Sequence, residues 1–366
     1  QEGLLYAGTE TGMYISFDAG ANWRPFQLNL PIVSITDLAL KNNNLIVATQ
    51  GRSLYIIDDL SVLHQASAMN DADAVHLYKP KDTYRMDGGS HNSNSVGTNH
   101  PSGVMTYFYL PKYNAEKDSI SLTYFDAKND TIKSYSTKSE EDKLEVKEGA
   151  NQFNWDMTYE GAERLPGMIL WWASTQGPKQ IPGNYTVKLN VNGTDYSQPY
   201  TVLADPRSEA SVADMQAQFD FIDDVNATVD HAHKSIKKIR NITGQLSAFE
   251  KQYKTNPDTE ELREKSKKLR EDLEEVEKAL YQTKNRSGQD PLNFPIKLTN
   301  KLAHLNALVG MGDFAPTDQD VAVKDELTAK IDSELNRFDK LVSDEVAAFN
   351  KEFNAMQLNY LFIQKD

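Results

Sequence analysis

Apolar residues are spaced in two different ways along this chain, and the change falls close to residue 207. Before it, runs such as GMYISFD and NYTVKLNV alternate apolar and polar positions with the two-residue period of a β-strand. After it, apolar residues recur every three or four positions, as in a helix that buries one face. The pattern therefore predicts β-structure first and helices afterwards.

The N-terminal β-region contains a repeat. LLYAGTETGMYISFD at 4–18 aligns with LIVATQGRSLYIIDD at 45–59 after a shift of 41 residues. Each copy predicts two short strands around a tight turn, and this period is typical of one β-propeller blade. Such a blade cannot bury both faces alone. We therefore expect 1–65 to be the last blades of a propeller, and the chain to be the C-terminal part of a longer protein.

The first copy ends in an eight-residue motif known as an Asp-box. Ser16, Asp18, Gly20 and Trp23 fit the pattern S-x-D-x-G-x-x-W. In such a turn the Asp accepts backbone hydrogen bonds, the Gly supplies a positive φ, and the Trp ring covers the hairpin. A glycosidase site would need a second, matched carboxylate. The acidic pair 58–59 is interpreted as closing a strand instead, so the motif is predicted to be structural and no catalytic residue is assigned.

Residues 75–205 alternate short β-rich runs with turns, among them an Asn192-Gly193 pair typical of a tight hairpin. About seven strands in such a length predict an immunoglobulin-like β-sandwich. In this region His91 and His100 are weak candidates for a metal site, since two imidazoles need a further ligand nearby. Neither a metal nor another cofactor is expected.

Tryptophans are the other candidates in this region. Trp171 and Trp172 are adjacent, and neighbouring residues of a strand point to opposite faces. One of the two could therefore stack on a sugar ring while the other packs in the core; core packing of these residues and of Trp155 is the alternative interpretation.

Residues 208–366 carry the helical pattern. Four helices are predicted, over 209–254, 258–284, 296–309 and 319–357, with Asn256-Pro257 as a break between the first two. Helices of this kind predict an antiparallel bundle whose apolar faces pack on one another rather than on an external partner helix. The predicted fold is thus partial propeller blades, then a sandwich, then a helical bundle.

Composition excludes several kinds of site. The 39 basic and 53 acidic residues give a net charge of −14, which repels nucleic acid and anionic lipid. The absence of cysteine excludes disulfides and thiolate chemistry. No apolar run approaches the roughly 18 residues that a membrane span needs, so neither nucleic acid nor a membrane-spanning segment is expected.

Several distinctive segments occur in a fixed order: the Asp-box, GRSLYIIDDLSVL, HLYKPKDTYRM, NQFNWDMTYEGAE and PGMILWWAS. In this order they resemble the C-terminal half of large exported bacterial proteins with sortilin-like Asp-box, or BNR, repeats, which are often labelled glycosyl-hydrolase-like. The resemblance covers residues 3–207. It implies upstream propeller blades and an exported location in a Gram-negative bacterium: periplasm, outer-membrane surface or extracellular space. From the related glycosidases, only the four Asp-box residues correspond, and those maintain the fold.

Two functions follow from these features. The first is non-catalytic: the chain binds a protein, peptide or glycan, or is an accessory subunit of a cell-envelope complex. The alternative is the accessory part of a glycoside hydrolase whose active site lies in missing upstream blades. Separately, Asp118-Ser119-Ile120 and Asp130-Thr131-Ile132 resemble O-glycosylation acceptors of exported bacterial proteins, which makes Ser119 and Thr131 candidate modification sites.

Overall fold

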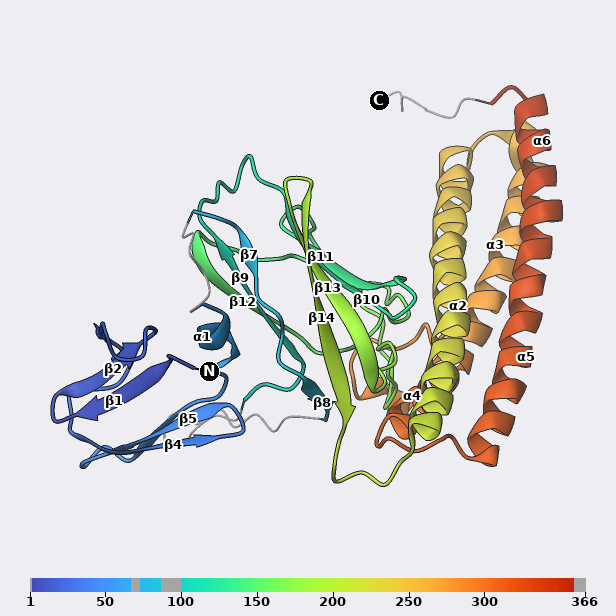
Figure 1. Ribbon diagram of the computed structural model, residues 1–366. Coiled ribbons are helices and arrows are strands. Elements are labelled where there is room, and N and C mark those ends of the chain that lie inside the picture. Colours follow the sequence, from blue (N-terminus) through green and yellow to red (C-terminus); the bar gives the residue numbers. More distant parts are fainter. Residues whose placement is uncertain (1, 67–72, 87–99, 359–366) are drawn as a thin grey trace. The chain divides into compact units, whose positions relative to one another are not determined.

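The computed structural model describes residues 2–66, 73–86 and 100–358. The chain is a mixed α/β protein of small sheets, one of which curls into a half-barrel, with helices in its C-terminal region (Figure 1). It divides into two compact units. The first, called the strand unit here, combines 1–157 with 180–207; the second, the helical unit, combines 158–179 with 208–366.

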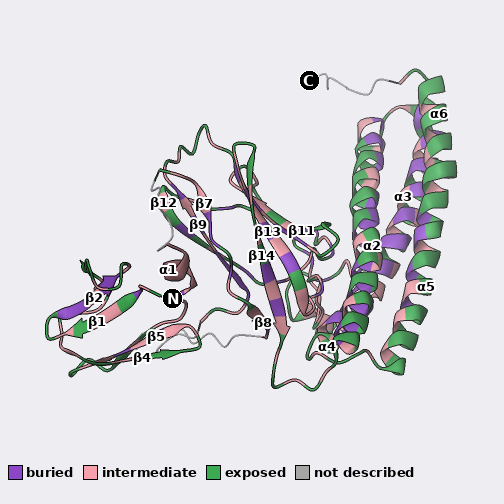
Figure 2. Ribbon diagram, in the orientation of Figure 1, coloured by how far each residue is buried: buried purple, intermediate pink, exposed green. Residues whose placement is uncertain are grey.

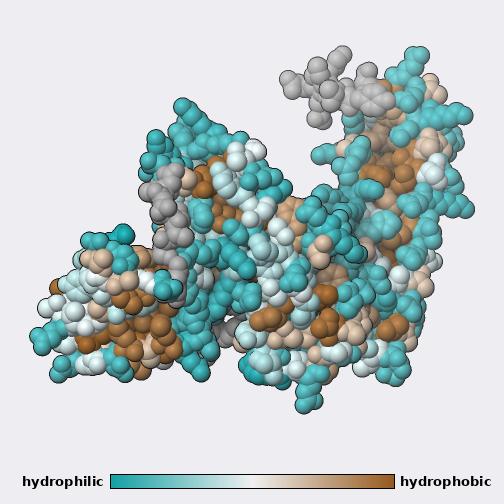
Figure 3. Space-filling model, in the orientation of Figure 1, coloured by the Kyte–Doolittle hydropathy of each residue, from teal (hydrophilic) through white to brown (hydrophobic). Residues whose placement is uncertain are grey.

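The two copies of the repeat each contribute a hairpin to one of two small antiparallel sheets in the strand unit. The first is β1 (Leu5–Thr9), β2 (Gly12–Ser16) and β3 (Arg24–Pro25); the second is β4 (Ile35–Lys41), β5 (Asn44–Thr49) and β6 (Leu54–Ile57). A short helix, α1 (Ser61–Ala66), follows. Met13, Leu45, Val47 and Leu60 form the core. The opposite face of β6 leaves Leu54 and Ile56 exposed, and hydrophobic surface is visible over these sheets (Figure 3).

Two further sheets complete the strand unit. One has the order β12-β9-β7 and the other β11-β10-β13-β14-β8. Their bounds are β7 (His76–Leu77), β8 (Thr83–Arg85), β9 (Val104–Leu110), β10 (Ile120–Phe125), β11 (Thr131–Ser136), β12 (Gly149–Trp155), β13 (Gly183–Val191) and β14 (Thr194–Ala204). The predicted Asn-Gly hairpin is confirmed, because Val191 pairs with Thr194 and both turn residues have positive φ.

The predicted propeller and immunoglobulin-like sandwich are wrong. Each repeat copy forms a two-stranded hairpin, β1-β2 or β5-β6, within a separate three-stranded sheet, whereas a propeller blade has four strands. The five-stranded sheet includes a parallel pair, β8 with β14, while the sandwich is antiparallel. The run MILWWAS, interpreted as a strand, forms none and belongs to the helical unit. Hairpin patterns specify neighbouring strands, whereas these partners are set by contacts distant in sequence.

The helices lie close to the predicted ranges. They are α2 (Val212–Gln252), α3 (Glu260–Leu280), α4 (Leu298–Val309), α5 (Asp318–Lys340) and α6 (Ala347–Ala355), with a π-helical turn at Leu341–Val346 that joins α5 to α6. Single turns of 3₁₀-helix occur at Pro257–Thr259 and Asp290–Leu292. Ser211 with Asp214 begins α2 as a capping box, which satisfies two otherwise free backbone donors.

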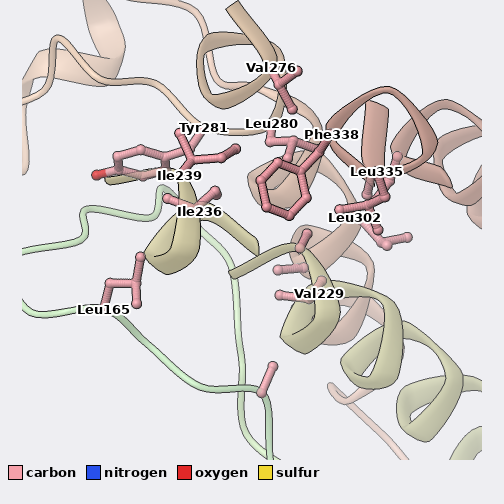
Figure 4. Packing of buried hydrophobic residues seen from close by; sticks show 14 of the residues in the cluster. Leu165, Val229, Ile236, Ile239, Val276, Leu280, Tyr281, Leu302, Leu335 and Phe338 are labelled. Atoms are coloured by element: carbon pink, nitrogen blue, oxygen red, sulfur yellow. The ribbon is translucent and has the colours of Figure 1, made fainter. Parts of the chain in front are cut away.

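Helix α2 is the central element of the helical unit. Its buried residues follow one side of the helix (Figure 2), where Val229, Ile236 and Ile239 are fully buried. They meet Leu302 of α4 and Phe338 of α5 in one apolar cluster (Figure 4). The coil 158–179 adds further apolar side chains to this cluster, namely Ala162, Leu165 and Met168. This coil therefore folds as part of the helical unit.

Candidate functional site

The Asp-box forms a closed network of local hydrogen bonds. Ser16 Oγ donates to Asp18 Oδ1 over 2.8 Å and accepts from the Gly20 amide over 2.9 Å. Asn22 donates to Asp18 through its backbone and its side chain, over 2.8 and 2.7 Å. These bonds, chiefly those from Asn22, lower the pKa of Asp18 to about 2. Gly20 has φ +94, and Trp23 lies beside it. Both Asp18 carboxylate oxygens are therefore engaged within the turn.

The weaker sequence candidates are scattered. His91 lies outside the described residues, and the His100 Nδ1 lies 2.8 Å from the Pro101 carbonyl oxygen. Among the residues that the structure describes, no three His, Asp or Glu side chains are grouped as a metal would require. Ser119 and Thr131 are both exposed. The described helices also include none that is both long and apolar enough to cross a bilayer.

The coil 158–179 that carries Trp171 and Trp172 folds back on itself. The Tyr159 amide donates to the Pro178 carbonyl over 3.0 Å, and the Ala162 amide to the Thr175 carbonyl over 2.9 Å. Gly161 permits this approach, because a Cβ there would lie 2.0 Å from the Thr175 carbonyl oxygen. The two arms are therefore held together by backbone bonds that leave no room for a side chain.

Buried asparagines on two helices fix the middle of this coil. Asn300 of α4 binds the Trp171 backbone twice: its Oδ1 accepts from the amide over 2.7 Å, and its Nδ2 donates to the carbonyl over 2.9 Å. Asn226 of α2 donates to the Gln176 carbonyl over 2.7 Å, and Asn306 donates to Asn226 over 2.9 Å. The helices thus hold backbone groups that would otherwise lie in the core without partners.

Trp172 projects from this fixed coil into solvent. Trp172 is 70% exposed, while Trp171 is only half-buried. The Trp172 carbonyl contacts Nδ1 of His304. The φ of Trp172, +47, is in the left-handed region, where a non-glycine residue costs about 1–3 kcal/mol. Such a conformation persists only where the surrounding structure imposes it. Trp155, by contrast, is 1% exposed and stacks on Tyr124 in the core.

A second group of side chains anchors the start of the coil. His233 of α2 is fully buried, and its Nδ1 lies 2.6 Å from the Glu163 carbonyl oxygen. The Glu163 amide donates to Asp230 over 3.0 Å. Burial lowers the pKa of His233, so its neutral form is favoured, with Nδ1–H as the donor. The imidazole therefore serves the coil as a hydrogen-bond donor.

A charged cleft lies beside the same coil. Its volume is about 450 Å³, and it is bounded by α2, α3, the loop after α3 and the coil residues 166–168. Its charged lining consists of Arg240, Glu274, Glu277, Lys278 and Arg286. Tyr281 forms one wall; its hydroxyl accepts from the Ile169 amide over 2.9 Å, and Figure 4 shows that hydroxyl turned away from the apolar cluster.

No protein-family model matches this chain, and no curated protein is significantly similar to it. The resemblance to exported Asp-box proteins therefore stays a prediction from the motifs.

Sequence reasoning named Trp171 and Trp172 but missed the residues that position them. Asn226, His233, Asn300 and Asn306 are all buried polar residues on helices. A signal exists in hindsight, because each interrupts an apolar helix face, and buried polar groups require partners. The charged cleft gives no such signal, because its residues come from segments far apart in the chain.

Proposed function

We propose that this chain is a non-catalytic glycan-binding protein of the cell envelope of a Gram-negative bacterium, related to the exported Asp-box proteins. The observation that carries the proposal is Trp172, an exposed indole on a backbone held in an unfavourable conformation. Backbone outliers of this kind concentrate at ligand-binding sites. A flat indole suits a sugar ring, because the C–H face of a pyranose is apolar and its rim is polar.

Preorganisation supports the same proposal. A ligand that must order a flexible loop loses affinity through the entropy of that ordering. Here Asn300 and Asn226 already fix the backbone on both sides of Trp172. Binding to this indole therefore requires little further ordering of the protein.

The size of the effect can be estimated from the exposure of Trp172. A Trp offers about 250 Å² at most, so 70% exposure leaves about 175 Å², and a sugar covering one face removes about half of it from water. At about 25 cal/mol per Å², this contributes about 2 kcal/mol, or roughly thirty-fold in affinity. Such a platform suits weak or repeated binding to a polysaccharide.

The proposal is tested with the full chain and a panel of soluble polysaccharides in affinity gel electrophoresis. Binding is expected for at least one polysaccharide, and Trp172→Ala should remove the retardation. Trp23→Ala is the matched control, because Trp23 is also exposed but belongs to the Asp-box turn. Retardation that survives Trp172→Ala would contradict the glycan site, and release of reducing ends would contradict a non-catalytic role. Cell fractionation tests the location.

A further inference from the structure

The charged cleft of the helical unit contains one guanidinium that is bonded to no carboxylate among the described residues. Three basic side chains, Arg240, Lys278 and Arg286, line it together with Glu274 and Glu277. Arg240 is paired with Glu277, and Lys278 with Glu274 and with Glu275 over 3.2 Å. The Arg286 side chain donates only to backbone carbonyls. Its positive charge suits a single anionic group.

The carboxylates of the cleft are occupied by particular partners. Arg240 Nε donates to Glu277 over 2.8 Å, and Glu277 is only 8% exposed. Glu274 accepts from Arg270 over 3.0 Å and lies 3.5 Å from Lys278. Only Nε of Arg240 is used in this way: over the described ranges, its terminal nitrogens contact no acceptor. They remain able to bind a ligand.

Arg286 is fixed on the other side of the cleft. Its Nη1 donates to the Thr283 and Asn285 carbonyls, each over 3.0 Å, which holds the planar guanidinium in one orientation. Its Nε and Nη2 have no acceptor within the described part of the chain. A guanidinium held in this way presents two parallel N–H donors, the geometry that binds a carboxylate bidentately.

Asn285 gives an independent indication of a ligand. It lines the cleft, is 6% exposed, and its Oδ1 is buried without a hydrogen-bond partner among the described residues. A buried amide that is incompletely paired costs free energy in a folded protein. Rotation of this amide, together with the nearby Thr243 hydroxyl, would provide polar groups for ligand hydroxyls.

We propose that this cleft binds the carboxylate of an acidic sugar, with Arg240 and Arg286 as its guanidinium ligands and Asn285 and Thr243 facing the sugar hydroxyls. A volume of about 450 Å³ lies within the range of small-ligand pockets. Because Arg286 is the one basic lining residue whose side chain is bonded to no carboxylate among the described residues, the cleft suits one carboxylate better than a dianionic phosphate. The assignment of a sugar rests on the proposed glycan function, whereas the anion site stands on the cleft alone.

The test is calorimetric titration of the full chain with D-glucuronate, D-glucose and inorganic phosphate. D-Glucuronate is expected to bind saturably, and D-glucose is expected to give no saturable heat. The affinity should fall when salt is raised from about 20 mM to about 300 mM. Arg286→Gln should weaken D-glucuronate binding at least about tenfold, because a charged hydrogen bond is lost. This variant is expected to fold, because the Arg286 side chain bonds only to loop carbonyls.

Arg337→Gln is the matched control, since this half-exposed arginine of α5 does not line the cleft. It should leave the D-glucuronate affinity unchanged. Equal affinity for D-glucuronate in Arg286→Gln and the parent chain would overturn the proposal, as would binding of phosphate without D-glucuronate. Polysaccharide retardation that survives Trp172→Ala would overturn the proposed function, while D-glucuronate binding that Arg286→Gln weakens would still support the cleft. Failure of the proposed function and failure of the cleft are therefore distinguishable.

Discussion

Asn300 offers the sharpest test of how the coil 158–179 is held. Replacing Asn300 with Ala removes the acceptor for the Trp171 amide and the donor to its carbonyl, 2.7 and 2.9 Å away. A typical hydrogen bond contributes about 1 kcal/mol net, and a buried group left unpaired costs about 1–3 kcal/mol. Asn300 is itself only 5% exposed, so water cannot readily replace the amide. The loss is therefore expected to be about 2–4 kcal/mol.

The assay is urea unfolding followed by circular dichroism at 222 nm, because long helices occur in the helical unit that contains this coil. Asn300→Ala should lower the unfolding free energy of that transition by the stated amount. Hydrogen exchange at the Trp171 amide should also become faster. Asn241→Ala is the control, because Asn241 is an exposed residue of α2 that bonds only to Gln245. A change below about 0.5 kcal/mol in Asn300→Ala would show that the two bonds to the Trp171 backbone do not stabilise the helical unit.

Three further predictions concern local devices of the fold. Because burial lowers the pKa of His233 below its usual 6.5, the unfolded chain binds more protons as pH falls below about 6.5. The unfolding free energy of the helical unit should therefore fall as the pH is lowered toward 5. His233→Gln should reduce this pH dependence in urea unfolding. Gly161→Ala should lower the unfolding free energy of the helical unit by about 2 kcal/mol or more, because the added Cβ would clash with the Thr175 carbonyl oxygen. Gly244→Ala in α2 has open space around it and should raise that free energy by about 0.5–1 kcal/mol. Urea unfolding measures both changes. The turn network lowers the pKa of Asp18 to about 2. The contribution of the Asp18 carboxylate to stability is therefore complete above its usual pKa of 3.8 and is lost as the pH falls through 2. Carboxyl NMR titration measures this pKa, and a midpoint near 3.8 would contradict the turn network.

Much of the secondary structure could be predicted from the local spacing of apolar residues. The apolar spacing that predicts a helix over 209–254 corresponds to α2, Val212–Gln252, because one apolar face on a common core fixes a helix whatever its partners are. The Asn192-Gly193 turn is likewise a local matter. The pairing of β8 with β14 joins residues more than a hundred positions apart, and no local pattern specifies such a partner.

The coil 158–179 shows why the rest could not be predicted. MILWWAS has the composition of a buried strand, yet Met168 packs among helices and Trp172 lies in solvent. A run of apolar residues indicates that its side chains are buried, but it does not indicate in which core. The adjacent tryptophans could be named as candidates from the sequence, because an indole can stack on a sugar. Asn226 and Asn300 bind the backbone of the coil 158–179 only once α2 and α4 pack beside that coil, so the sequence does not reveal their roles.

The glycan site proposed at Trp172 is tested most directly by the dissociation constant of the best-bound polysaccharide. Isothermal titration calorimetry measures it for the parent chain, Trp172→Ala and Trp23→Ala. Trp172→Ala should lose roughly thirty-fold in affinity, from the apolar area of one indole face. Trp23→Ala should bind as the parent chain does. Equal affinities for the parent chain and Trp172→Ala would contradict a glycan platform at Trp172.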